Sequence, residues 1–219
     1  MSFRSPVIVL LGIILCLAAI WAAFRLDRPV REAVVASQGP DWKKSASYKF
    51  HSTVRILGDW PPVIVAAAIA LAAARLSGNR RWTRILAAAM IASTLAGILA
   101  NTSRLTTGRT RPRESPKIEQ GFYGPAKFGK SAYNSFPSGH AATAFGFALA
   151  IALSSPAWGI PAIAGAVLVC WSSIAIGAHH LSDIVVSFLL STLVAWLVVR
   201  WMNRSGNARI DRLLGFRDE

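Results

Sequence analysis

The sequence predicts an all-α, polytopic membrane protein in which six transmembrane helices form one bundle. Of its 219 residues, 53% are hydrophobic and only 16% are charged, and the mean hydropathy is +0.44, whereas soluble domains average about 25% charged residues. The apolar residues also gather in stretches near the ~20 residues that a bilayer-spanning helix needs. These observations exclude a soluble enzyme and a disordered chain. We expect residues 1–219 to form a single integral membrane domain.

The apolar stretches are separated by polar loops, and tryptophans stand at or beside several of their ends, as in the aromatic belts of membrane proteins. The second, third and fourth stretches are short, so we expect their polar ends to extend the helices and Arg75 and Arg84 to snorkel to the interface. The six spans are expected at roughly residues 6–24, 60–76, 85–100, 140–154, 158–177 and 184–201.

The first stretch has an alternative interpretation as a signal peptide, because Ala22 and Ala23 offer small residues near its end. Its apolar run exceeds the usual 7 to 15 residues of such a segment, so we expect it to remain as a span. An even number of spans places both termini on one side of the membrane. The two long loops, residues 25–59 and 101–139, then share the other face with the short turn at residues 179–183.

The net charge of +14 comes from 24 Lys and Arg against 10 Asp and Glu, which suits anionic lipid, a phosphorylated substrate or nucleic acid. Nucleic acid is the weakest option, because the basic residues are divided between the two membrane faces. The long-loop side carries 14 basic residues and the terminal side 10. Setting aside Arg104, Arg109 and Arg111 as anion ligands leaves 11 against 10, so loop charge does not determine orientation. The two cysteines lie inside apolar runs, and we expect no metal site.

Histidines gather at the predicted membrane boundary. His140 is the only group between Ser131 and Ala178 that titrates near neutrality, and the segment AHHLSD supplies His179, His180 and Asp183. One interpretation is that these residues only cap helices at the interface. His51, in the first loop, is expected to be exposed or to face lipid.

A catalytic interpretation uses the same residues as a unit. His179 and Asp183 are four residues apart, which on a continuous helical turn places them on one face. The carboxylate would then fix one imidazole tautomer and leave the other nitrogen free as a nucleophile. His140 would be the general acid. His180 competes with His179 on position alone, but it lacks the three-residue gap to Asp183, and we expect a minor role for it.

A matching anion site is expected in the segment NTSRLTTGRTRPRES, where arginines alternate with small and hydroxylated residues. Planar guanidinium groups bind phosphate oxygens in pairs. Ser138 adds a hydroxyl, and Gly139 exposes backbone N–H groups at a predicted helix N-terminus, where the dipole favours an anion. The alternative for the arginines is a solvated basic loop or a patch for lipid headgroups.

Three spaced segments carry a family resemblance. They read Arg104-LTTGRT-Arg111-Pro112, then Pro137-Ser138-Gly139-His140, then Ser172-Ser173-IAIGA-His179-HLS-Asp183. They resemble the signature of the type-2 phosphatidic acid phosphatase superfamily of integral membrane lipid phosphatases. In that signature six residues separate a Lys from Arg-Pro, and Pro-Ser-Gly-His follows. Five residues then separate Ser-Arg from a His, and three residues separate that His from an Asp. Arg104 replaces the family lysine and Ser173 replaces the family arginine.

The resemblance implies a metal-independent phosphatase without a cofactor, which cleaves a phosphomonoester or pyrophosphate of a lipid through a phosphohistidine. His179 would be the nucleophile, Asp183 would orient it, and His140 would protonate the leaving group. The phosphoryl oxygens would be held by Arg104, Arg111, Ser138 and Gly139. Candidate substrates are phosphatidate, phosphatidylglycerol phosphate, a polyprenyl pyrophosphate and a lipid A-like glycolipid. The implied location is a bacterial inner membrane, with the site facing the periplasm.

Ser173 leaves alternatives open, because losing one charged donor aimed at a transition state can cost about 100- to 1,000-fold in rate. Arg109 and Arg113, in the same loop, are candidates to replace the missing charge. One alternative function is a non-catalytic relative that binds anionic lipid through the basic loop. Another is a phosphotransferase that passes the phosphoryl group to a second lipid instead of water.

Overall fold

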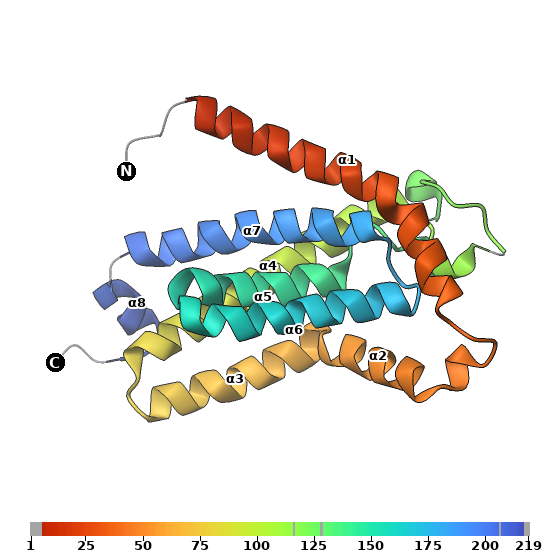
Figure 1. The fold of residues 1–219 in the computed structure, drawn as a ribbon. Coiled ribbons are helices and arrows are strands. Elements are labelled where there is room, and N and C mark those ends of the chain that lie inside the picture. The colour runs from red at the N-terminus through yellow and green to blue at the C-terminus, as the bar shows by residue number, and fades with distance from the viewer. Residues whose placement is uncertain (1–5, 116, 128, 206, 217–219) are drawn as a thin grey trace.

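The computed structural model describes residues 6–115, 117–127, 129–205 and 207–216, and over these residues it contains helices and no β-strand (Figure 1). The α-helices are α1 (Pro6–Ala36), α2 (Ala46–Leu57), α3 (Trp60–Leu76), α4 (Arg80–Thr107), α5 (Gly139–Ser154), α6 (Pro156–Ala175), α7 (Leu181–Arg204) and α8 (Asn207–Leu213). Short 3-10 helices lie at Trp42–Lys44, Pro112–Glu114, Gly124–Lys127 and Ser131–Tyr133.

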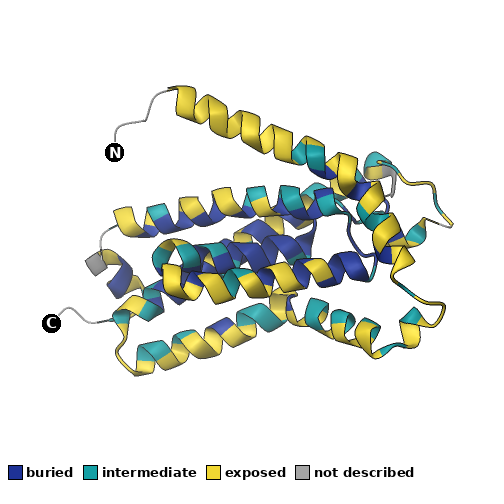
Figure 2. Cartoon of the chain, viewed as in Figure 1, coloured by how far each residue is buried: buried dark blue, intermediate teal, exposed yellow. Residues whose placement is uncertain are grey.

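The core is a bundle of α4, α5, α6 and α7, in which α5 packs on the other three helices (Figure 2). Small residues make this packing close. One face of α4 presents Ala89, Ala92, Ala96 and Ala100, all fully buried, and Gly146 of α5 lies so near the Ala92 carbonyl that a Cβ there would crowd it. In a bilayer the hydrophobic effect does not drive helices together. Small residues instead let the helix backbones approach closely and pack through van der Waals contacts.

Hydroxyl groups add hydrogen bonds between the core helices. The Ser93 hydroxyl of α4 donates to the Thr143 carbonyl of α5 at 3.0 Å, and the Ser191 hydroxyl of α7 donates to the Ala142 carbonyl at 2.9 Å. All four residues are buried. These bonds fix the rotation of α5, the helix that carries His140.

The outer helices expose their apolar faces. Most of α1 is exposed (Figure 2), with large side chains such as Leu15 and Trp21 more than 60% accessible. The helix has 31 residues, and its apolar part is so little buried that it is suited to contact with lipid. The chain is therefore an integral membrane protein.

The helix boundaries differ from the predicted spans. The first helix continues to Ala36 instead of ending at residue 24, and α4 runs from Arg80 to Thr107 instead of 85–100, which places Arg104 on a helix and not in a loop. Polar residues at these ends can extend the helices because they lie where the chain leaves the apolar region.

The predicted count of six spans is not confirmed. Among the described residues, four helices are long and apolar enough to cross a membrane, and a fifth span arises if α2 and α3, bent by 59°, are one broken span. The helix α5 is apolar but has only 16 residues.

One end of the bundle gathers the segments expected to carry function. The C-terminal ends of α1, α4 and α6 and the N-terminal ends of α5 and α7 lie there, together with α2, while α8 lies at the opposite end (Figure 1). Gly108, with φ of +58°, ends α4, and Ser138 caps α5 by accepting from the Ala141 N–H. Gly177, with φ of +67°, makes the turn between α6 and α7.

Candidate active site

His179 lies in the turn between α6 and α7 and is almost completely buried, at 1% exposed. Its Nδ1 is 2.8 Å from the Ser135 carbonyl oxygen. A carbonyl only accepts, so Nδ1 carries the proton and Nε2 keeps a free lone pair. Nε2 is buried and has no hydrogen-bond partner among the described residues. The ring is therefore held in the tautomer that a nucleophile requires.

Asp183 orients His179 less directly than the sequence predicted. The expected continuous helical turn is absent, because α6 ends at Ala175 and α7 begins at Leu181. The Asp183 Oδ2 atom is 3.6 Å from His179 Nδ1, beyond hydrogen-bond range. The Ser135 carbonyl holds the ring, and the carboxylate acts on it through its charge.

Burial lowers the pKa of His179 to about 4, and the charge of Asp183 opposes this effect. The nearby charges of Arg111 and Arg104 lower the pKa further. The imidazole is therefore neutral, and able to act as a nucleophile, at neutral pH.

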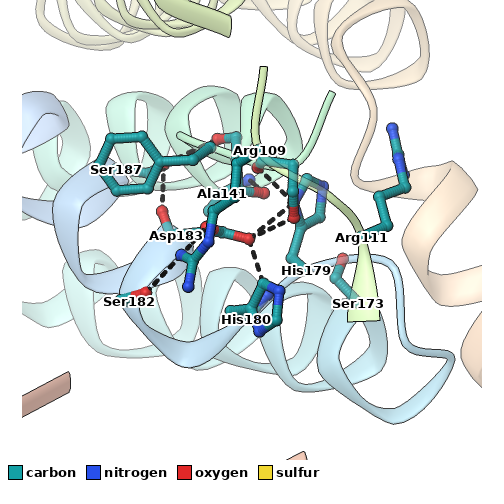
Figure 3. A network of polar contacts seen from close by, with 12 residues as sticks. Arg109, Arg111, Ala141, Ser173, His179, His180, Ser182, Asp183 and Ser187 are labelled. Atoms are coloured by element: carbon teal, nitrogen blue, oxygen red, sulfur yellow. Dashed lines mark hydrogen bonds and ion pairs between the residues drawn. The ribbon is translucent and has the colours of Figure 1, made fainter. Parts of the chain in front are cut away.

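The Asp183 carboxylate accepts hydrogen bonds from three donors (Figure 3). It accepts from Arg109 Nη1 at 2.5 Å, from the Ser135 hydroxyl at 2.6 Å and from the His180 N–H at 2.7 Å. The carboxylate is fully buried. Because Ser135 contacts both Asp183 and His179, this network fixes the position of the imidazole.

Arg109 lies between two carboxylates. Its Nη2 is 2.6 Å from Asp27 Oδ2, and Asp27 also accepts from the Ser182 N–H at 2.8 Å and from the Ser182 hydroxyl at 2.6 Å. The sequence predicted that Arg109 binds phosphate. In the structure its guanidinium instead donates to the carboxylates of Asp27 and Asp183. The role of Asp27 was not predicted from the sequence. The sequence feature that could have indicated it is an acidic residue just after the first apolar stretch.

His140 opens α5 and faces His179, with 6.1 Å between the ring centroids. Its Nε2 accepts from Arg55 Nη1 at 2.9 Å and lies 3.5 Å from Asp59 Oδ2. Its Nδ1 is buried and has no hydrogen-bond partner among the described residues. Two imidazoles thus face one another, each with a nitrogen available to a ligand. Arg55 was not predicted, because no local motif surrounds it.

Arg104 and Arg111 lie beside the two histidines. Arg104 donates to Asn101 Oδ1, and its guanidinium lies against Gly139, where a Cβ would overlap it. Arg111 is buried and donates from Nε to the Ser131 carbonyl at 2.8 Å. Burial lowers the pKa of Arg111 to about 10, and the like charges of Arg113, Arg104 and Arg55 add to the effect. The site therefore concentrates positive charge.

Serines and other histidines complete the surroundings. Ser138 is fully buried and accepts the helix-capping bond from Ala141 at 3.3 Å. The Ser173 hydroxyl donates to the Val169 carbonyl at 3.0 Å. His180 Nε2 is 3.2 Å from the Thr110 carbonyl. The sequence predicted that His51 is exposed or faces lipid. It is instead half-buried, with Nδ1 3.0 Å from the Ser172 hydroxyl.

Unpaired donors and acceptors converge on this site. Buried polar side chains are normally paired. Among the described residues, the buried side-chain nitrogens without a partner are Arg55 Nε, Arg104 Nε, His140 Nδ1, His179 Nε2 and His180 Nδ1. A tetrahedral anion between the imidazoles would pair the two arginine nitrogens. In the same described residues, no group of three or more His, Cys, Asp or Glu is arranged to hold a metal ion.

A cavity of about 540 Å³ lies beside the loop that carries Arg111 and Arg113. It is rich in cationic and aromatic side chains, with Glu114 as the acidic exception. The cations are Arg31, Lys43, Arg113 and Lys117, and the aromatic residues are Trp42 and Tyr48. This surface suits a polar, anionic headgroup.

Comparisons with known proteins identify the family of the chain. The sequence profile of the PAP2 superfamily matches residues 82–207. Lipid A 1-phosphatases of Rhizobium johnstonii and Rhizobium etli are 37% and 34% identical over 91 and 90 residues, which is 41% of this chain in both cases. The match spans only 36% and 38% of those relatives' length. Asp27 and Arg55 lie outside the segment that matches the profile.

The fold has a solved counterpart. The crystal structure of a PAP2-type phosphatidylglycerolphosphate phosphatase from Bacillus subtilis aligns with a TM-score of 0.58. The alignment covers 92% of this chain and 97% of the other, at 21% identity. At that identity the likeness establishes the arrangement of helices and not the substrate.

Proposed function

The chain belongs to the PAP2 superfamily, and on that premise we propose that it is a membrane lipid phosphatase working through a phosphohistidine. It cleaves a phosphomonoester or pyrophosphate of a lipid. The observation that carries this proposal is the tautomer of His179: its Nδ1 is bound to the Ser135 carbonyl, and its Nε2 is free and faces His140 among arginines.

In the first step His179 Nε2 attacks phosphorus, an N–P bond forms, and the bond from phosphorus to the lipid oxygen breaks. Protonated His140 gives its proton to the leaving oxygen. In the second step neutral His140 takes a proton from water, the water oxygen attacks phosphorus, and the N–P bond breaks. Inorganic phosphate leaves, and both histidines return to their starting states. No metal or cofactor enters the scheme.

Charge that develops on the phosphoryl oxygens is stabilised by Arg104 and Arg111. The Ser138 hydroxyl and the first N–H groups of α5, starting at Gly139, add donors, since such groups have no partner within their own helix. The positive charge of phosphorylated His179 is balanced by Asp183, 3.6 Å away. Arg109 positions Asp183 and does not touch the phosphate.

The substrate is a lipid whose tail stays in the bilayer while its phosphate enters the site between the helix ends. The exposed apolar helices and the cationic cavity support this class. The names of the relatives make lipid A and phosphatidylglycerol phosphate the first substrates to test. We place the site on the periplasmic side of a bacterial inner membrane.

The proposal is tested by phosphate release from the purified protein in detergent, with EDTA present. The panel contains phosphatidate, phosphatidylglycerol phosphate, a polyprenyl pyrophosphate and lipid A. Release from at least one lipid in EDTA is expected, and it should vanish in His179→Ala at an unchanged unfolding temperature. Equal release by wild type and His179→Ala would contradict the mechanism. Binding of anionic lipid without release from any substrate would favour the non-catalytic alternative.

A further inference from the structure

We propose that Arg55 of α2 supplies the phosphate-binding guanidinium that is missing at Ser173. The inference rests on the proposed function and names one more residue that contacts the substrate. It assigns that task to a helix outside residues 82–207, the segment that matches the family profile.

The residue at 173 cannot bind the anion itself, and the loop arginines do not replace it. Ser173 is fully buried, and its hydroxyl donates to the Val169 carbonyl. Arg109 is paired with two carboxylates. Arg113 is 42% exposed at its side chain and pairs with Glu114 at 3.1 Å. The missing charge must therefore come from elsewhere.

The helix α2 is seated on the part of α6 that carries Ser172 and Ser173. In the middle of α2, His51 Nδ1 is 3.0 Å from the Ser172 hydroxyl. At the C-terminal end of α2, the capping residue Gly58 lies so close to Val169 that a Cβ would overlap the valine side chain. Arg55 is one turn beyond His51, on the same face of α2. The small serines on α6 thus allow α2 to approach and bring Arg55 to the site.

Arg55 reaches the reacting groups directly. Its Nη1 is 2.9 Å from His140 Nε2. Its Nε is buried without a partner among the described residues, as is His140 Nδ1. A guanidinium carries five N–H donors, so Arg55 retains a free edge that matches phosphate oxygens. The charge of Arg55 also contributes to lowering the pKa of Arg111, so the two cations lie near each other.

The contact with His140 links phosphate binding to the proton donor. A guanidinium only donates, so Arg55 keeps the His140 Nε2 unprotonated while the two are bonded. When phosphate draws Arg55 away, Nε2 becomes free to take a proton. Asp59, 3.5 Å from Nε2, then faces the resulting imidazolium. Substrate binding thus prepares the general acid.

The test compares Arg55→Gln and Arg55→Lys with Lys49→Gln, which removes an exposed charge from the same helix. Two quantities are measured: kcat and KM for lipid hydrolysis, and binding of inorganic phosphate by calorimetry. Arg55→Gln should lower kcat about 100- to 1,000-fold, more than it changes KM, because the donor acts on the transition state. Phosphate affinity should fall at least about tenfold, whereas Lys49→Gln should match wild type.

Wild-type kcat and phosphate affinity in Arg55→Gln would overturn the inference. Phosphate binding separates it from the proposed function: if no lipid is hydrolysed even by wild type, phosphate affinity still reports on Arg55. If Arg55→Gln does not fold, phosphate binding by Arg55→Lys provides the test. An ammonium group cannot form the two-pronged contact, so weaker phosphate binding is expected, and unchanged binding contradicts the role of Arg55.

Discussion

Asp27 offers a test of the buried network behind His179. Replacing Asp27 with Ala removes one carboxylate from Arg109 and the acceptor of two Ser182 bonds, at 2.6 to 2.8 Å. Both side chains of the Asp27–Arg109 pair are at most 10% exposed. Breaking a buried pair by removing one partner costs about 3–5 kcal/mol, because the other charge stays buried.

In this variant Arg109 still has its ion pair with Asp183, so we expect the lower end of that range of destabilisation, about 3 kcal/mol. For a chain of this length, 1 kcal/mol corresponds to about 2–4 °C. Asp27→Ala should therefore lower the unfolding temperature in detergent by about 6–12 °C, as measured by intrinsic fluorescence. It should also reduce kcat, because Arg109 loses its contact with Asp27 and then positions Asp183 less firmly.

The matched control is Glu32→Ala. Glu32 pairs with Arg28 on the same helix at 2.7 Å, but both side chains are mostly exposed. Because exposed pairs contribute little, no measurable shift is expected. Equal shifts in the two variants would refute the claim that burial makes the Asp27–Arg109 pair important.

Three further predictions concern the site. Gly139→Ala should cut activity at least about tenfold, because the new Cβ overlaps the Arg104 guanidinium, whereas Gly165→Ala, which meets open space, should be active. The pKa of His179 is about 4 in the folded protein and ordinarily 6.5, so the unfolded chain binds more protons between these values. Lowering the pH from 6.5 to 4 should therefore reduce the unfolding temperature more in wild type than in His179→Gln; equal losses would contradict this. Prolonged EDTA treatment should leave phosphate release unchanged, and restoration of a lost activity by added divalent metal would argue against the scheme.

The sequence predicted the helical membrane class and the cluster of His140, His179 and Asp183 at one end, because these depend on local signals. Apolar stretches identify spans, and three spaced motifs identify the residues. Helix ends were predicted less well, since α1 and α4 continue through polar residues at the membrane boundary.

The contacts behind the motifs could not be predicted, because they join residues far apart in the chain. Asp27 meets Ser182 across 155 positions, and Arg55 meets His140 across 85. Neither lies in a motif. The carbonyl that binds His179 Nδ1 belongs to the backbone of Ser135. Every residue has a backbone carbonyl, so the residue type does not indicate such a contact. The distance between His179 and Asp183 depended on where α7 begins, which spacing alone does not determine.

The central claim is tested most directly by trapping the phosphorylated enzyme. Wild type is mixed with a hydrolysed lipid carrying labelled phosphate and quenched with alkali, in which phosphohistidine is stable. Peptide mass spectrometry then locates the label. We predict alkali-stable, acid-labile phosphate on His179 that is absent from His179→Gln. Label on another residue, or turnover with no labelled protein at any quench time, would contradict the mechanism.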